Sequence, residues 1–382
     1  MSHGHHVTVI TCAPNCPNGV LYEGYQNRLF QREYVDQIEV VRVATFIAAN
    51  KGTFLRIANY ISYLLSSLFF SFFLKRPDLI IATSPQFFCG WAGVLASKLR
   101  RVPFLLEVRD IWPDSIVAVG AMRNRWILRM LGWLEQKMYA SARHIVTVGE
   151  GYKQSLEQKG VPPEKITVVT NGVNREVFYP READPALKSE MGLEGKFVCS
   201  YIGTIGMACG LDVVLRAGEL LQRRNGNNYA FLLVGDGAER VKLEEQAKQM
   251  GLKNVYFTGR QDHQRIPDFF AVSDVCLIHL KKKDLFKTVM PSKIFEAAGM
   301  ARPVIIGVEG FASQLVDQAK AGICIEPENE TQLLEAIERM AQDKQYREQC
   351  GNDGYNYITR HFDRDQLAAD YLKVIQRTAA PA

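Results

Sequence analysis

The residues best suited to chemistry lie in one short stretch, Pro291 to Glu296, whose pattern indicates the beginning of a helix. Pro291 is typical of a first helical turn, where the missing N–H donor costs nothing. Glu296 follows Lys293 by three residues and Ser292 by four, so the three side chains fall near one another at the start of the helix. A hydroxyl, an ammonium and free N–H groups bind anions, and a carboxylate one turn later accepts from sugar hydroxyls. The stretch therefore predicts a site for a nucleoside diphosphate and its ribose. An ordinary surface helix with Glu296 paired to Lys293 is the alternative.

Glycine turns at the ends of expected strands form a second feature. Gly203, Thr204 and Gly206 follow one strand, Gly235 follows the next, and Arg260 follows a third. No turn contains the complete GxGxxG fingerprint of dinucleotide-binding proteins, so each is weak evidence alone. Because parallel strands end at one edge of a sheet, the turns together predict a cleft for an anion.

Charged residues accompany both expected sheets. Lys287 and Lys293 lie near the glycine turns, and Arg109 and Asp110 follow a strand expected at 103–108 in the first half of the chain. Ligand sites in open α/β sheets lie at the carboxyl ends of the strands. We therefore expect all four side chains at the active site; a salt-bridged structural turn is the alternative for Arg109 and Asp110.

The elements that must position these residues alternate between strand and helix in two series. Such alternation predicts an α/β fold with parallel sheets. Segment 174–196 lacks this pattern and carries two prolines, which indicates a boundary between domains. We expect an N-terminal domain at 1–190, a C-terminal domain at 191–362 and a helix in 363–382 that crosses back onto the first domain.

Residues 54–74 form the most ambiguous segment, because no charged residue occurs from Ile57 to Leu74. Small and polar residues interrupt the segment, and strands at 38–44 and 79–83 flank it as members of one expected sheet. We predict a helix whose polar face packs on that sheet and whose outer face contacts lipid, rather than a transmembrane span. Basic residues at the two ends suit phospholipid headgroups: Lys51, Arg56, Lys75 and Arg76.

Composition excludes several classes of protein. The chain has 382 residues, 47% of them hydrophobic, which is typical of two folded domains rather than of a disordered protein. A net charge of +5 is too small and dispersed to indicate nucleic acid, but it favours an anionic membrane surface. The eight cysteines follow no zinc or disulfide spacing, and no signal peptide is expected, so a cytoplasmic location is favoured.

Several motifs in order resemble one family over nearly the whole chain. The motifs are Pro291–Glu296 followed by Arg302-Pro303-Val304-Ile305, Gly203–Ala208, Glu107–Ser115 and Asn171-Gly172-Val173. They are similar to those of family 4 (group 1) retaining glycosyltransferases of the GT-B fold, in the bacterial O-antigen and capsule subgroup that includes fucosamine transferases. The resemblance implies two facing Rossmann-like, doubly wound domains, the first binding a lipid-linked sugar and the second a nucleotide sugar.

The resemblance also implies roles for individual residues. Glu296 corresponds to the carboxylate that binds the donor ribose, and Pro291, Ser292 and Lys293 to the diphosphate contacts. The glycine turns correspond to the backbone that lies against the donor, and their residues are Gly203, Thr204, Gly206 and Gly235. Arg260 corresponds to the contact with the nucleotide base. Arg109 and Asp110 correspond to the acceptor side, beside the reacting carbon. No metal and no other cofactor is implied, because protein cations neutralise the diphosphate.

The chain departs from the family pattern at three places. Thr288 stands where the wider family has a second glutamate, and Thr204 and Cys209 stand where it has an arginine and a lysine. We expect Lys287 and Lys293 to compensate for those cations. The sequence begins at a Gly-His turn, so the resemblance implies that the first strand–helix unit of the N-terminal domain is missing.

We therefore expect a retaining, metal-independent glycosyltransferase that acts peripherally on the inner face of the cytoplasmic membrane. Its expected donor is a UDP-linked N-acetylated hexosamine or deoxyhexosamine, and its acceptor a polyprenyl-diphosphate-linked saccharide of O-antigen, capsule or exopolysaccharide synthesis. A nucleotide-sugar 2-epimerase of the same fold is one alternative. A catalytically inactive module that binds membrane surfaces is the other.

Overall fold

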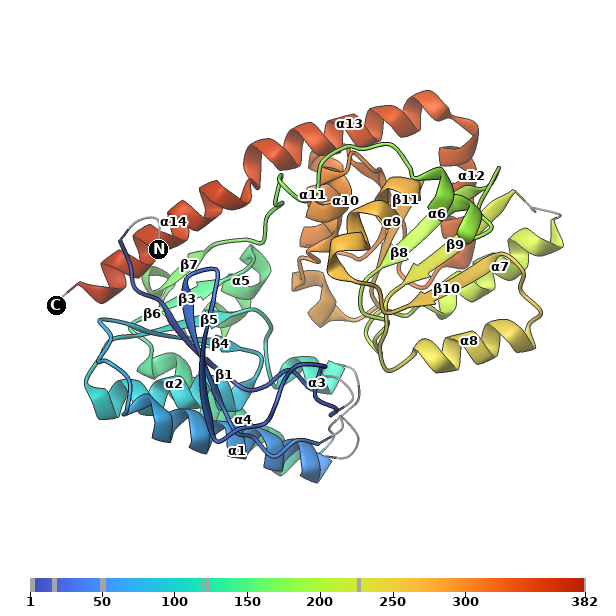
Figure 1. Cartoon of the computed structure of the whole chain (residues 1–382). Helices are drawn as coiled ribbons and strands as arrows, with labels where there is room; N and C mark the ends of the chain where they lie inside the picture. The colour runs from blue at the N-terminus through green and yellow to red at the C-terminus, as the bar shows by residue number, and fades with distance from the viewer. Residues whose placement is uncertain are drawn as a thin grey trace.

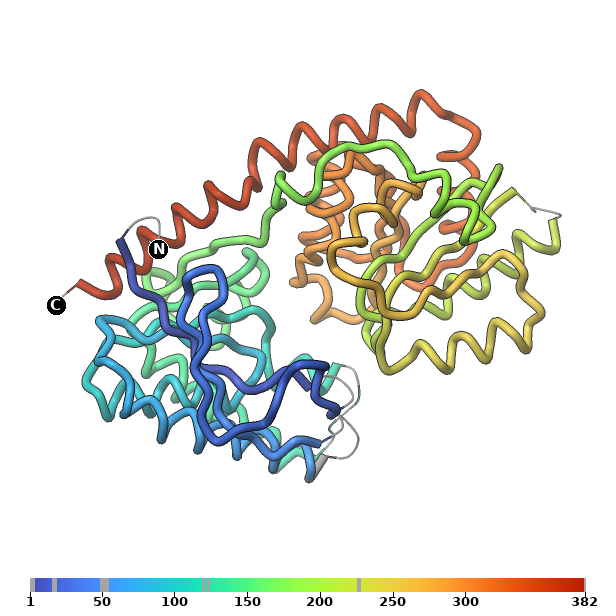
Figure 2. Tube along the Cα trace, in the orientation of Figure 1, coloured from blue at the N-terminus to red at the C-terminus, as the bar shows by residue number. Residues whose placement is uncertain are grey.

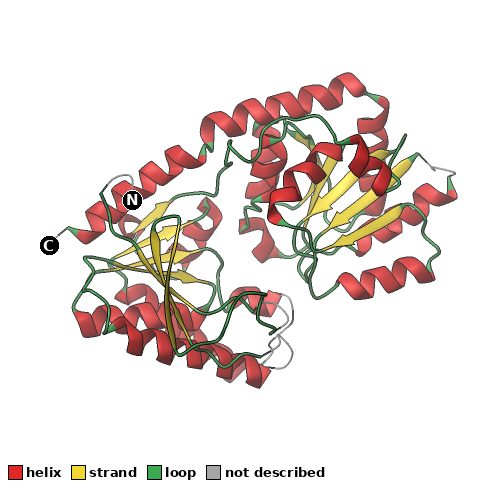
Figure 3. Ribbon diagram, in the orientation of Figure 1, coloured by secondary structure: helices red, strands yellow, loops and turns green. Residues whose placement is uncertain are grey.

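The computed structural model describes residues 4–15, 19–48, 53–118, 120, 122, 124–224 and 228–380. Figure 1 shows two α/β halves side by side, with one long helical stretch reaching from the second half back to the first. In each half, strands lie between helices (Figure 3).

The first half contains two sheets instead of the single expected one. Strand β1 (Thr8–Thr11) pairs in parallel with β3 (Ile38–Val43), and β3 pairs antiparallel with β2 (Phe30–Val35). A separate parallel sheet has the order β4-β5-β6-β7. Its strands are β4 (Ile80–Ser84), β5 (Phe104–Val108), β6 (His144–Thr147) and β7 (Ile166–Val168). The prediction that segments 38–44 and 79–83 share a sheet is therefore wrong.

The hairpin between β2 and β3 was also missed, for a local reason. Its two turn residues, Asp36 and Gln37, have φ of 48° and 67°. Two left-handed residues close a two-residue hairpin, but such turns are usually recognised from Asn-Gly or Asp-Gly. Here no glycine marks the turn, so the sequence pattern gave no signal.

Helices cover the sheets of the first half. Gly93 shows how closely they pack, since a Cβ at this position would lie 2.6 Å from the Cβ of Ala82 on β4. The helices are α1 (Thr53–Ser71), α2 (Phe87–Arg100), α3 (Asp114–Ala118), α4 (Arg125–Ser141), α5 (Glu150–Gln158) and the 3-10 helix η1 (Pro163–Lys165).

The second half contains one six-stranded sheet in the order β10-β9-β8-β11-β12-β13, with every pairing parallel. Counted within this half, the order is 3-2-1-4-5-6, which is typical of doubly wound nucleotide-binding sheets. The strand order reverses between β8 and β11, where such sheets hold their ligand. The strands are β8 (Phe197–Ile202), β9 (Tyr229–Val234), β10 (Val255–Gly259), β11 (Val275–His279), β12 (Val304–Gly307) and β13 (Gly322–Cys324).

Two apolar cores lie on opposite faces of this sheet because its strands are buried on both sides. Phe231 and Leu233 face one core, and Leu232 and Val234 face the other. The helices are α6 (Pro185–Glu190), α7 (Asp212–Arg223), α8 (Arg240–Gln249), α9 (Ile266–Val272), α10 (Lys293–Gly299), α11 (Phe311–Gln318), α12 (Glu330–Gln342), α13 (Lys344–His361) and α14 (Arg364–Ala379), with 3-10 helices η2 (His263–Arg265) and η3 (Asp284–Thr288).

The chain crosses between the halves twice, and the two crossings lie side by side (Figure 2). The Val173 N–H donates to the Phe362 carbonyl at 2.9 Å, and the Arg364 N–H donates to the Val173 carbonyl at 3.1 Å. Beyond this bridge, α14 runs along the first half, where Val374 packs against Leu105 and Val146.

The segment after the first crossing belongs to the second half. Val173, Phe178 and Leu187 are all buried in one of its two cores. Packing thus places these residues with the second domain, although the sequence had grouped them with the first. Contact between the halves also comes from η3 and the residue after it, since Leu285 and Val289 pack against the core of the first half.

Candidate active site

Two glycine turns meet at the carboxyl end of the second sheet. Gly203 and Gly235 have φ of 137° and 135°, conformations that side chains rarely adopt. A Cβ on Gly235 would lie 2.0 Å from the carbonyl oxygen of Gly203, so the two turns pack backbone to backbone. The Gly203 N–H donates to the Val234 carbonyl at 2.8 Å, and the Ile205 N–H to the Asp236 carbonyl at 3.0 Å. The structure therefore brings the predicted turns together as one surface.

Lys293 reaches this surface from α10. A Cβ on Gly203 would lie 2.4 Å from Cε and 3.0 Å from Nζ of Lys293, so a side chain at this position would displace the amine from the turn. The ammonium donates to the Tyr201 hydroxyl and lies 3.7 Å from the centre of the Tyr201 ring. That hydroxyl in turn donates to the carbonyl of Thr204 at 2.7 Å. Tyr201 thus ties the amine to the turn.

Burial controls the charge of both predicted ligand groups. It lowers the pKa of Lys293 to about 8, although Cys209 and Glu296 act in the opposite direction. Burial also raises the pKa of Glu296, against the effect of Lys293 and His263. A buried cation without a carboxylate partner binds an anionic ligand strongly because little water competes for it.

The Glu296 carboxylate forms no hydrogen bond or ion pair with any residue in the described part of the chain. The alternative reading, an ordinary helix with Lys293 paired to Glu296, is therefore not what the structure shows. Neither group is neutralised by the other through a direct ion pair.

The start of α10 differs from the prediction. The helix begins at Lys293, so Pro291 lies two residues before it, in a turn closed by the Ile294 N–H on the Pro291 carbonyl at 3.2 Å. Ser292 is the N-cap residue, but its side chain makes no capping bond. Its exposed hydroxyl instead lines a cavity between the two halves.

That cavity of about 310 Å³ also receives Arg109 and, from α14, Arg364 and Tyr371. The Arg109 guanidinium donates to Glu107 at 3.1 Å and to Asn171 at 3.2 Å. The structure therefore places Arg109 and Ser292, predicted from opposite halves of the chain, around one cavity.

Asp110 is not among the residues that line this cavity. Its carboxylate accepts from the Ser115 side chain and the Ile111 N–H, and burial raises its pKa. Asp110 is therefore turned toward the beginning of α3, where it orders the loop that follows β5.

Two predicted cations are occupied elsewhere. Lys287 forms ion pairs with Asp284 at 2.8 Å and Glu309 at 3.5 Å, and it does not line the cavity that holds Arg109 and Ser292. Arg260 crosses to the other half, where it donates to the Tyr22 hydroxyl at 2.6 Å and lies 4.7 Å from the ring centre.

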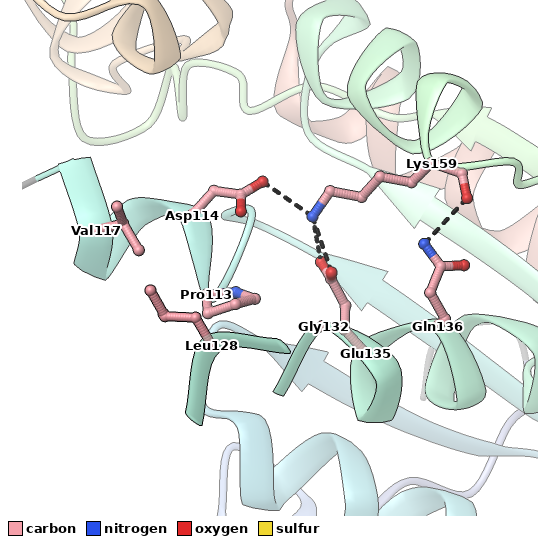
Figure 4. A pocket seen from close by; sticks show the side chains of 8 residues that line it. All are labelled: Pro113, Asp114, Val117, Leu128, Gly132, Glu135, Gln136 and Lys159. Carbon is pink, nitrogen blue, oxygen red and sulfur yellow. Dashed lines mark hydrogen bonds and ion pairs between the residues drawn. The ribbon is translucent and has the colours of Figure 1, made fainter. Parts of the chain in front are cut away.

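A second cavity, of about 400 Å³, lies in the first half between α3, α4 and the end of α5 (Figure 4). Lys159 lies between two carboxylates there, 2.9 Å from Asp114 and 2.8 Å from Glu135. The Tyr139 hydroxyl donates to Glu135 at 2.6 Å. No sequence motif predicted this cluster, in which one ammonium is shared by two carboxylates.

Helix α1 carries its polar side inward, as predicted. Ser67 and Ser71 are buried, and the Tyr63 hydroxyl donates to the Ile10 carbonyl at 2.9 Å. Asn59 donates to the carbonyl of Phe46 at 2.6 Å. The polar face therefore packs on the first half.

The opposite side of α1 is apolar and exposed. The large apolar side chains at 57, 61, 65 and 69 recur every four residues, and Phe72 and Phe73 extend this surface. Of the basic residues expected at its ends, Lys51 lies outside the described residues, whereas Arg56, Lys75 and Arg76 are exposed. In the described part of the chain, no helix is long and apolar enough to cross a membrane.

Comparisons with known proteins agree with this architecture. Residues 1–172 match the family described as glycosyl transferase 4-like domain, and residues 185–357 match glycosyl transferases group 1. WcaI of Escherichia coli K12, whose name assigns it to colanic acid biosynthesis as a glycosyl transferase, is 26% identical over 88% of this chain and 84% of its own. WbjE of Pseudomonas aeruginosa, named as a glycosyltransferase, is 24% identical over 70% of this chain and 67% of its own.

Solved structures share the fold. The Anabaena protein HepE, in complex with UDP-glucose, has a TM-score of 0.74 over 98% of this chain and 100% of its own, at 16% identity. A sucrose-phosphate synthase from Thermosynechococcus elongatus also has a TM-score of 0.74, over 98% of this chain and 90% of its own, at 17% identity. The predicted GT-B fold with two Rossmann-like domains is therefore confirmed. The two family matches together cover nearly the whole sequence. With the shared fold, they show that the chain belongs to the group 1 glycosyltransferases of the GT-B fold.

Proposed function

We propose that this glycosyltransferase moves a sugar from a UDP-linked donor to a polyprenyl-diphosphate-linked saccharide during synthesis of a bacterial surface polysaccharide. One observation carries the proposal: the Lys293 amine is held against the Gly203 turn, and one turn further along α10 lies the Glu296 carboxylate, which has no ion-pair partner among the described residues. A cation beside a glycine turn suits a diphosphate, and a carboxylate suits the two ribose hydroxyls.

The names of relatives support the polysaccharide and the donor. WcaI is named for colanic acid biosynthesis, and HepE has been described in complex with UDP-glucose. The proposed donor sugar is an N-acetylated hexosamine or a deoxyhexosamine, and the proposed products are O-antigen, capsule or exopolysaccharide chains.

The proposed reaction retains the configuration of the sugar by displacement on one face. The bond from the anomeric carbon to the UDP phosphate oxygen breaks, and a bond to the acceptor oxygen forms on the same side. The acceptor proton passes to the departing phosphate oxygen. Lys293 stabilises the charge that develops on the diphosphate, so the chemistry needs no metal ion.

The proposed location is the inner face of the cytoplasmic membrane. The exposed apolar face of α1 supplies insertion, and Arg56, Lys75 and Arg76 supply attraction to anionic headgroups. A polyprenyl-linked acceptor resides in that membrane, so attachment places the first domain beside its substrate.

A panel of nucleotide sugars tests the proposal. We expect UDP and one UDP-sugar to raise the thermal unfolding temperature, and the radiolabelled sugar to appear in a lipid extract that contains acceptor. Stabilisation by GDP- or dTDP-linked sugars alone would contradict the assigned donor. Epimerised UDP-sugar formed without acceptor would identify an epimerase instead. Binding without any turnover would leave only an inactive binding module.

A further inference from the structure

The cavity of about 310 Å³ beside the domain crossing has a composition that the proposed donor site does not explain. Most of its lining comes from the first domain and from α14, and Ser292 is its one contribution from the second domain's donor elements. Lys293 and Glu296 do not line it. The cavity is therefore a separate chamber on the acceptor side of the cleft.

Its charge is positive because two arginines face one carboxylate. Arg109 is paired with Glu107 at 3.1 Å, and Glu107 also accepts from the Tyr371 hydroxyl at 3.5 Å. The guanidinium of Arg364 makes no hydrogen bond or ion pair with any residue that the structure describes. One cation is thus left over for a ligand, and a guanidinium binds phosphate oxygens in a bidentate manner.

Apolar side chains form part of the remaining lining, beside the polar residues Thr170, Asn171 and Ser292. Val146, Val148 and Val169 come from the first sheet and the loops beyond it, and Leu367 comes from α14. A chamber with an apolar wall and a cationic rim suits a ligand that joins a phosphate to a hydrocarbon chain. A free inorganic anion would leave the apolar wall unused.

We propose that this cavity binds the diphosphate and first isoprene units of the lipid-linked acceptor, so that α14 is part of the acceptor site. The inference rests on the proposed function, because it takes the acceptor to be a polyprenyl diphosphate. The C-terminal helix then has two tasks: it joins the domains, and through Arg364 it positions the acceptor phosphate beside Arg109.

Farnesyl diphosphate, titrated into the full chain by calorimetry, tests the proposal. We expect Arg364→Gln to weaken its binding about tenfold and Arg364→Glu to abolish it, because a lost or reversed charge faces the phosphate. Arg364→Lys should keep most of the affinity. Lys373→Met is the matched control, since this residue lies on the same helix but pairs with Asp370 at 2.7 Å in solvent.

UDP is titrated into the same proteins, and thermal unfolding checks that each is folded. Unchanged UDP affinity in Arg364→Gln, with weakened farnesyl diphosphate, supports the separate acceptor chamber. Equal loss for UDP would assign the cavity to the donor and overturn the proposal. Equal affinity for inorganic pyrophosphate would overturn the lipid part. If Arg364→Gln and Arg364→Glu both bind farnesyl diphosphate as tightly as the wild type does, the inference is refuted and the UDP-dependent function is unaffected. If the wild type fails to bind UDP, the proposed function alone is refuted.

Discussion

The two domains differ sharply in what they show to solvent. Among the described residues, the second domain exposes only Tyr179, Met207 and Val241 as large apolar side chains, and every other such residue lies in the first domain. Helix α1 contributes an apolar face, and α4 adds Trp126 and Trp133, with Arg129 and Lys137 over their rings at 5.5 and 5.7 Å. Tryptophan with a nearby cation is typical of a membrane interface.

The second domain instead concentrates buried polar groups at one edge of its sheet. The Tyr201 hydroxyl contacts both Cys209 and Lys293 behind the glycine turns. The difference fits the division of tasks proposed above, in which the first domain meets lipid and acceptor while the second binds the charged leaving group. Each prediction below tests one side of that division.

The largest effect is expected from Lys293→Met. Loss of the one cation held at the Gly203 turn should reduce turnover about a hundredfold to a thousandfold, as for other groups that stabilise developing charge. Uridine binding, which involves no diphosphate, should barely change. Lys283→Met, in the exposed loop before η3, is the control.

Lys287→Met should cost much less than Lys293→Met because two carboxylates already pair with Lys287. Equal losses for the two lysines would contradict this placement.

Glu296→Ala should weaken UDP binding by about 1.5–3 kcal/mol, the usual worth of hydrogen bonds to a charged group. The fold should tolerate the change, since the carboxylate has no partner among the described residues. Calorimetry with UDP and with UDP lacking the ribose hydroxyls measures the effect. If the deoxy analogue loses as much affinity in the variant as UDP does, the ribose is not the contact.

The pH dependence of UDP binding should follow Lys293. Its pKa is lowered to about 8, so the Lys293 amine of the free protein loses its charge above that pH. In the complex, the bound diphosphate keeps the amine protonated. Affinity should be flat below about pH 8 and fall by up to about tenfold per pH unit above it. The unfolded chain binds more protons in that range, so stability of the free protein should rise with pH. Uridine binding and the Lys293→Met variant should show no such slope.

The smallest effects concern the exposed apolar face of α1, which we propose contacts the membrane. Phe69, Phe72 and Phe73 point outward, whereas Phe70 packs on Phe30 with ring centres 5.2 Å apart. Changing an outward phenylalanine to serine should weaken binding to anionic vesicles by about 1 kcal/mol and leave the unfolding temperature unchanged. Phe70→Ser should lower the unfolding temperature instead. Vesicle sedimentation at low and high salt separates the two outcomes, and uniform behaviour of all four variants would refute the amphipathic reading.

Features that depend on neighbours in sequence were predicted well. The helix at 54–74, the glycine turns and the one-turn spacing of Lys293 and Glu296 follow from local periodicity and turn chemistry. Ser292 is the exception, because it lies just before the helix and lines a different cavity. The two-domain α/β class follows from alternating strands and helices. These patterns repeat every two to four residues and can be read without knowing which segments meet.

Contacts between distant segments had no such signal. Tyr201 holds Lys293 across 92 positions, and Tyr371 reaches Glu107 across 264. Arg364 enters a cavity that only the second crossing of the chain creates. Lys287 and Asp110 carried the right chemistry in sequence, but Glu309 and Ser115 engage them in the fold. The sequence by itself determined which side chains could bind a nucleotide sugar. Tertiary structure alone decided which remain free to do so, because a charge is available to a ligand only where no other part of the chain pairs with it.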